Sequence, residues 1–94
     1  MTILVTQAAA QELIAAIAFY ENNSPGLGTA FYKEVAEAVE FINEFPSGWQ
    51  KAGAHTRKCV LKKFPYLILY IAENDRIIIT AIAHQHRHPR SYSR

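Results

Sequence analysis

The chain has 94 residues, of which half are apolar and about a fifth are charged. This length supports one modest core and excludes a second domain or an elaborate cofactor cleft. No apolar run reaches the roughly 18 to 20 residues of a membrane span, and the N-terminus lacks the basic start and long apolar stretch of a signal peptide. We therefore expect a single cytoplasmic domain over residues 1–94, with no membrane partner.

Charge is distributed unevenly along the sequence. Residues 1–50 contain one basic and six acidic residues, a net charge of −5, whereas residues 51–94 contain nine basic and two acidic residues, a net charge of +7. A basic half of this kind attracts nucleic acid or an acidic protein partner, and charge alone does not choose between them. The lone Cys59 cannot form a disulfide within the chain, which agrees with a cytoplasmic location.

The first half of the chain predicts a short strand and a first helix. Residues 3–5 are apolar and mostly β-branched, and Thr6 is a suitable N-cap for a helix over residues 8–23. Within that helix, apolar residues recur at three- and four-residue spacing, so one side faces a core. The segment NNSPG over residues 22–26 then has the composition of a turn.

A second helix is predicted from about Leu27, and Pro46 and Gly48 end it. The short turn before it requires the two helices to form an antiparallel hairpin. One face of the second helix is apolar and is expected to be buried: Phe31, Val35, Ala38, Val39, Ile42 and Phe45. The glutamates fall largely on the other side and are interpreted as a solvated face: Glu34, Glu37, Glu40 and Glu44.

After residue 56 the sequence changes from helical to strand periodicity. It predicts three strands, over residues 57–64, 67–72 and 76–83, joined by short turns into an antiparallel meander. The expected fold is α+β with the order β-α-α-β-β-β, an antiparallel sheet with the helical hairpin packed on one face. The other face is too apolar to be left in water, so we expect a partner chain. Five residues are interpreted as packing residues rather than as catalytic or base-stacking groups: Phe45, Trp49, Cys59, Tyr66 and Tyr70.

Three motifs occur in a characteristic order. They are a tyrosine followed by PGLG in the helical hairpin, FPY-x-I-x-Y at the second strand of the meander, and AIAHxxRxPxxY after the last strand. Together they resemble the RelE/ParE superfamily of toxins from bacterial type II toxin–antitoxin pairs, and most closely its ParE branch, over nearly the whole chain. The resemblance implies a cognate acidic antitoxin that wraps an extended segment and a helix around the toxin. It also implies growth inhibition when the antitoxin is lost.

The resemblance leaves the target open, because ParE-type members poison DNA gyrase and RelE-type members cut mRNA in the ribosomal A site. The long hairpin with its PGLG turn is typical of the ParE branch, and the first fifty residues are too acidic for an RNA cradle. We therefore favour gyrase inhibition by protein–protein contact, with no catalytic step and no cofactor. The expected target-binding residues are basic or lie near the C-terminus: Arg57, Arg87, Arg90, Tyr92 and Arg94. A third possibility is a member that pairs with its antitoxin and has lost its toxicity.

The alternative is a metal-independent, ribosome-dependent endoribonuclease. Such an enzyme must activate a 2′-hydroxyl, stabilise a phosphorane and protonate the leaving 5′-oxygen. The resemblance places Arg57, Arg87 and Tyr92 at positions that match the catalytic groups of RelE-like ribonucleases.

Histidines 84, 86 and 88 alternate along the chain and are candidate zinc ligands. They lack a nearby carboxylate or thiolate as a fourth ligand, so no metal site is predicted. His84 is interpreted as a structural residue at the end of the last strand.

Overall fold

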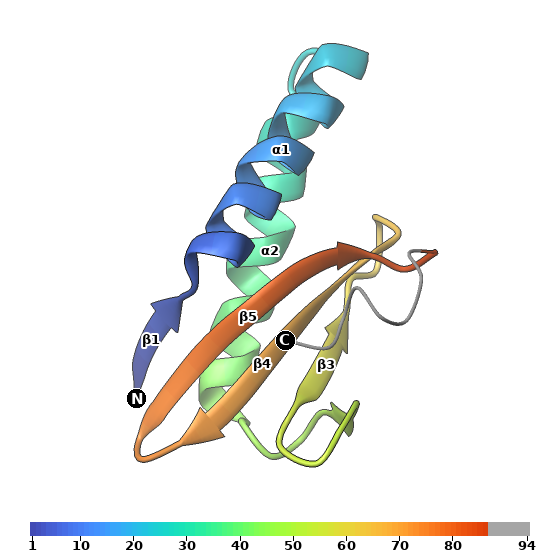
Figure 1. Cartoon of the computed structure of the whole chain (residues 1–94). Helices are drawn as coiled ribbons and strands as arrows, with labels where there is room; N and C mark the ends of the chain where they lie inside the picture. Colours follow the sequence, from blue (N-terminus) through green and yellow to red (C-terminus); the bar gives the residue numbers. More distant parts are fainter. Residues whose placement is uncertain (87–94) are drawn as a thin grey trace.

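The computed structural model describes residues 1–86 and shows two helices on one face of a five-stranded sheet (Figure 1). The elements in chain order are β1 (Thr2–Val5), α1 (Gln7–Asn23), α2 (Leu27–Glu44), β2 (Gln50–Lys51), β3 (Arg57–Val60), β4 (Tyr66–Glu73) and β5 (Arg76–His84). The strands lie in the order β1-β5-β4-β3-β2. The predicted α+β class and the helical hairpin are confirmed.

The predicted meander is present, and strands β2 to β5 pair with one another in antiparallel fashion. β1 pairs with β5 in parallel, which makes the complete sheet mixed. Asn74 and Asp75 form the two-residue turn between β4 and β5, and both have positive φ, 50° and 59°. Asn and Asp tolerate this left-handed conformation better than most residues, which is why this short sequence closes the hairpin.

Hydrogen bonds at the N-terminus of each helix stabilise the helical hairpin. The Thr6 hydroxyl accepts a hydrogen bond from the Ala9 N–H at 3.1 Å and begins α1. The N-cap of α2 is Gly26, which has no side chain, and the Glu21 carboxylate of α1 accepts the N–H groups of Gly26 and Gly28 at 3.0 Å instead. A Cβ on Gly28 would lie 2.7 Å from the Ile17 carbonyl oxygen, so the two helices make contact through this glycine.

The main core lies between the hairpin and the sheet. Tyr20 of α1 and Phe31 of α2 pack with Phe64 and Tyr66, with ring centroids 4.8 to 6.0 Å apart. The largest fully buried side chains are Tyr70, Phe31, Ile42, Ile68, Leu69, Ile77 and Ile79. The aromatic cluster joins both helices to the start of β4 and so fixes where α2 lies over the sheet.

The opposite face of the sheet has no helix among residues 1–86 (Figure 1). It is apolar, as predicted, but its central side chains are buried rather than exposed. These are Leu67, Leu69, Ala81 and Ala83. Leu4 and Val60, on the flanks of the same face, are exposed.

Two predictions within these elements are wrong. The strand expected over residues 57–64 ends at Val60, because the backbone N–H groups of Lys62 and Lys63 bond to the Glu34 side chain instead of to a strand. Phe45 is not on the buried face of α2, because it follows the last helical residue as the C-cap and is 60% exposed. Neither helix in the described part of the chain has the length and apolar character of a membrane span.

Candidate functional site

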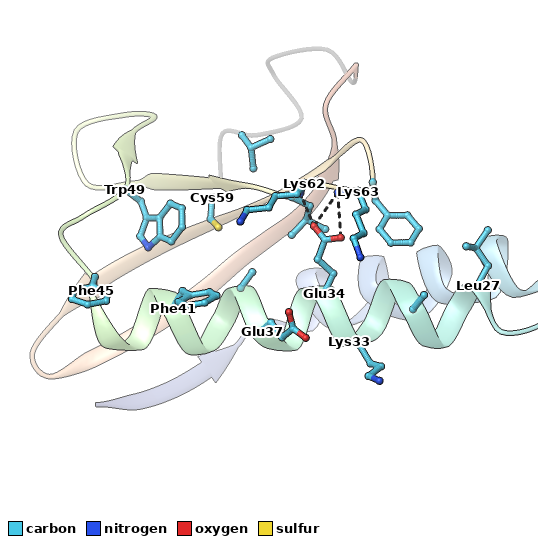
Figure 2. Close-up of a pocket in the computed structure, with 15 residues that line it drawn as sticks. Leu27, Lys33, Glu34, Glu37, Phe41, Phe45, Trp49, Cys59, Lys62 and Lys63 are labelled. Atoms are coloured by element: carbon cyan, nitrogen blue, oxygen red, sulfur yellow. Dashed lines mark hydrogen bonds between the residues drawn. The ribbon is translucent and has the colours of Figure 1, made fainter.

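A cavity of about 880 Å³ lies between α2 and β3 (Figure 2). Its apolar lining includes Phe41, Phe45, Trp49, Cys59, Val60 and Leu61. Its charged lining consists of Lys33, Glu34, Glu37, Lys62 and Lys63. We call this feature the α2–β3 groove.

The α2–β3 groove leaves large apolar side chains open to solvent. Phe41 is 52% exposed and Phe45 is 60% exposed. Figure 2 shows Phe41 on α2 facing Cys59 and Trp49 across the space between helix and strand. An apolar hollow with a charged rim is the common form of a binding site.

Glu34 holds one side of the groove together. Its carboxylate accepts the backbone N–H groups of Lys62 and Lys63, at 2.5 and 3.2 Å, and so connects α2 to the segment after β3 (Figure 2). The prediction of a solvated Glu34 is therefore wrong, whereas Glu37, Glu40 and Glu44 are exposed as expected. Lys62 and Lys63 are exposed at the rim of the groove.

Cys59 is buried against the groove and does not have the properties of a nucleophile. Burial raises the pKa of its thiol to about 11, and the negative charge of Glu34 contributes to the increase. Burial also raises the pKa of the Tyr70 hydroxyl to about 12. Both groups are neutral at physiological pH, and both pack as the sequence predicted.

These two pKa values predict how stability depends on pH. In the unfolded chain the Cys59 thiol has a pKa of about 9 and the Tyr70 hydroxyl a pKa of about 10. Above these pH values the unfolded chain loses the two protons, whereas the folded protein still keeps them. The associated stability is therefore complete below pH 9 and is lost as the pH rises through the folded values of about 11 and 12. We expect the urea midpoint to fall between about pH 9 and 12, with a smaller decrease in Cys59→Ala. An unchanged midpoint over this range would contradict both assignments.

Arg57, the one predicted site residue in the described part of the chain, makes a structural contact. Its guanidinium donates to the Trp49 carbonyl at 2.6 Å, and in the sheet it lies opposite Tyr70 and Lys51. The Tyr70 hydroxyl donates to the Pro46 carbonyl, also at 2.6 Å. These two bonds attach the segment after α2 to the sheet. Arg57 also lines a smaller polar cavity of about 250 Å³ with Lys51 and His55.

The other predicted site residues, Arg87, Arg90, Tyr92 and Arg94, lie outside the described residues, as does His88. His84 ends β5 and packs against the Tyr66 ring with centroids 5.2 Å apart. Its Nδ1 accepts the His86 backbone N–H at 3.1 Å. Within residues 1–86, no three His, Cys, Asp or Glu side chains are grouped so that they could hold a metal ion.

Sequence reasoning missed two residues of the α2–β3 groove, Phe41 and Glu34. One signal was available for Phe41, because it is an aromatic residue one position before the buried Ile42 and so off the apolar face of α2. No local signal distinguishes Glu34 from the exposed glutamates that follow it, because its partners are almost thirty residues away in the chain.

Comparison with known proteins identifies the family. The sequence model of the ParE toxin of the type II toxin–antitoxin system, parDE, matches residues 3–89. The chain belongs to the ParE toxin family. This confirms the predicted superfamily and branch, and a type II toxin of this family implies an antitoxin partner.

A solved structure shares the fold of this ParE-family toxin. It is described as a chromosomal ParDE toxin–antitoxin system from P. aeruginosa, and it aligns with a TM-score of 0.78 and 19% sequence identity. The alignment covers 89% of this chain and 95% of that chain. No curated protein matches the sequence.

Proposed function

We propose that this ParE-family toxin acts in the cytoplasm as a single domain, inhibits growth by poisoning DNA gyrase, and is neutralised by a cognate antitoxin bound in the α2–β3 groove. The observation that carries the proposal is the family match over residues 3–89. ParE-type toxins are gyrase poisons, as the resemblance of the sequence motifs implied. The target-binding residues that we propose remain Arg57, Arg87, Arg90, Tyr92 and Arg94.

The chemistry of the α2–β3 groove supports the antitoxin part of the proposal. Its apolar surface suits the apolar side of an amphipathic segment, and the three lysines in its lining outnumber the two glutamates and suit the acidic residues of an antitoxin. Such a segment would cover Phe41 and Phe45, which are otherwise in water. An acidic, amphipathic antitoxin segment is therefore the occupant that fits both the apolar lining and the lysines of the groove.

The state of Arg57 in the free toxin does not match that of a catalytic arginine. A catalytic arginine must direct its donors at a phosphate, whereas Arg57 is half-buried and donates to the Trp49 carbonyl. The described residues thus offer a protein-binding surface.

Inducing the free toxin in bacteria separates gyrase poisoning from mRNA cleavage. We expect early DNA-damage signalling, broken chromosomal DNA and arrested growth, with mRNA intact when it is mapped by primer extension. Co-expression of the protein encoded by the neighbouring gene should restore growth. Codon-phased mRNA cuts that precede any DNA damage would contradict the gyrase proposal and support the ribonuclease alternative with Arg57, Arg87 and Tyr92.

A further inference from the structure

A small polar cavity at the β2–β3 hairpin lies apart from the α2–β3 groove. The hairpin forms the edge of the sheet away from β1 (Figure 1). The cavity has a volume of about 250 Å³, and we call it the β2–β3 cavity. Its polar lining includes three basic side chains and two hydroxyls: Lys51, His55, Arg57, Ser47 and Thr56. The two sites share no lining residue, so a segment bound in the groove leaves these bases uncovered.

Strand pairing places two of the bases side by side. Lys51 of β2 lies directly opposite Arg57 of β3, and both line the cavity. Like charges in directly opposite positions destabilise a sheet, and in the described part of the chain no carboxylate forms an ion pair with either base. Glu73, the one acidic residue of the lining, lies opposite Arg76 in the β4–β5 pairing. This arrangement favours an anion from outside the chain.

The basic groups of the cavity have different roles. The Arg57 guanidinium donates to the Trp49 carbonyl at 2.6 Å, so it contributes a fixed positive charge to the wall. The side chains of Lys51 and His55 are exposed and make no hydrogen bond to any described residue. A fixed charge with free ammonium and imidazole donors beside it matches the charge and the acceptor oxygens of a phosphate group.

We propose that the β2–β3 cavity binds a backbone phosphate of duplex DNA. The cavity is smaller than the roughly 300 to 1,000 Å³ of a small-molecule site, so it admits a phosphate group and not a whole nucleotide. The described residues that line it include no Phe, Tyr or Trp, the rings on which proteins stack unpaired bases. A duplex keeps its bases inside and its phosphates outside. The choice of DNA rests on the proposed function, because a toxin that poisons gyrase meets the DNA held by that enzyme.

The tip of the hairpin leaves the cavity accessible to a surface as broad as a duplex. Ala52, Gly53 and Ala54 are small and exposed, and the Ala52 N–H donates to the Thr56 carbonyl at 2.8 Å and closes the loop. One cavity provides few phosphate contacts, so the toxin alone should bind DNA weakly and without sequence preference. We expect a dissociation constant on the order of 10 to 100 µM, as for other non-specific complexes.

Fluorescence anisotropy of a labelled duplex of about 20 base pairs, titrated with the purified full chain at about 50 to 200 mM KCl, tests the inference. Lys51→Gln should raise the dissociation constant about tenfold, the usual loss for one charge-assisted hydrogen bond. It should also reduce the slope of log K against log [salt] by about 0.9, the value for one phosphate contact. His55→Gln should weaken binding less. The assay contains no gyrase, so its result is independent of gyrase poisoning.

Lys58→Gln is the matched control, because it removes the same charge from the same hairpin. Lys58 lies opposite Leu69, whose side chain belongs to the other face of the sheet, and it does not line the cavity. Its salt slope should equal that of the wild type and its affinity should stay within about twofold. Circular dichroism melts should show that all three variants fold. Equal losses for Lys51→Gln and Lys58→Gln would show a general effect of charge and overturn the cavity as the site.

Three further ligands identify the source of the phosphate. Tighter binding of the single strand or of duplex RNA than of duplex DNA would overturn the DNA assignment. In an NMR titration with inorganic phosphate, saturation of the Lys51 and Thr56 amide shifts below about 1 mM would indicate a site for free phosphate and also overturn it. A toxin that binds DNA through Lys51 but leaves gyrase active refutes the proposed function and supports the cavity. A toxin that poisons gyrase, and whose Lys51→Gln variant binds DNA like the wild type, refutes this inference alone.

Discussion

Replacing Phe41 by aspartate is expected to raise the dissociation constant for the cognate antitoxin at least 30-fold. Phe41 lies on the floor of the α2–β3 groove and is 52% exposed in the free toxin, so a bound apolar segment would bury it (Figure 2). Losing a buried aromatic contact at the centre of an interface costs about 2 kcal/mol or more, which corresponds to about 30-fold in affinity. The substituted carboxylate would also repel an acidic partner.

Tyr32→Asp is the matched control for this prediction. Tyr32 lies on the same helix with almost the same exposure, 51%, but it does not line the groove. Isothermal titration calorimetry with purified antitoxin should show near wild-type binding for Tyr32→Asp and weak binding for Phe41→Asp. Equal affinities for the two variants would exclude the α2–β3 groove as the antitoxin site.

Replacing Phe31 by alanine is expected to destabilise the fold by about 3 to 5 kcal/mol, the usual cost of removing a buried aromatic side chain. Phe31 is fully buried, and its ring packs against Tyr20, Phe64 and Tyr66 with centroids 5.0 to 5.2 Å apart. These contacts join α1, α2 and the start of β4. Since small domains have about 5 to 15 kcal/mol of total stability, this loss removes between about a fifth and all of it.

Thermal unfolding followed by circular dichroism measures this effect. Each kcal/mol shifts the midpoint of a domain of this size by about 4 to 8 °C, so Phe31→Ala should melt at least about 12 °C below the wild type. The neighbouring Tyr32→Ala removes an exposed ring and should change stability by about 0.5 kcal/mol or less. If the two variants melt together, the aromatic cluster does not hold the hairpin on the sheet.

Local signals explain why most of the fold could be predicted. The period of α2, the capping residue Thr6 and the Asn74–Asp75 turn each specify structure over a few residues, and all three occur as expected. The signals failed where a distant partner decided the outcome. The Glu34 side chain binds the backbone that follows β3, and the strand ends there. Strand β2 has only two residues, and it forms because the chain turns back after it and pairs it with β3.

The candidate site was harder to predict than the fold. The α2–β3 groove is made by residues that are far apart in the chain, such as Phe41 and Cys59, and no motif marks them. Arg57 was recognised from its position, but the sequence could not show that its guanidinium binds the Trp49 carbonyl. An arginine on a strand has the same pattern whether it faces a phosphate or a backbone oxygen.

The most direct test is a DNA cleavage assay with purified gyrase, supercoiled plasmid, ATP and the toxin. We predict that the toxin blocks supercoiling and, after detergent and protease treatment, leaves linear DNA in proportion to its concentration. Adding the antitoxin first should prevent both effects, and the weakly binding Phe41→Asp toxin should escape this protection. Unchanged supercoiling and intact DNA at a toxin concentration that cuts mRNA on ribosomes would contradict gyrase poisoning.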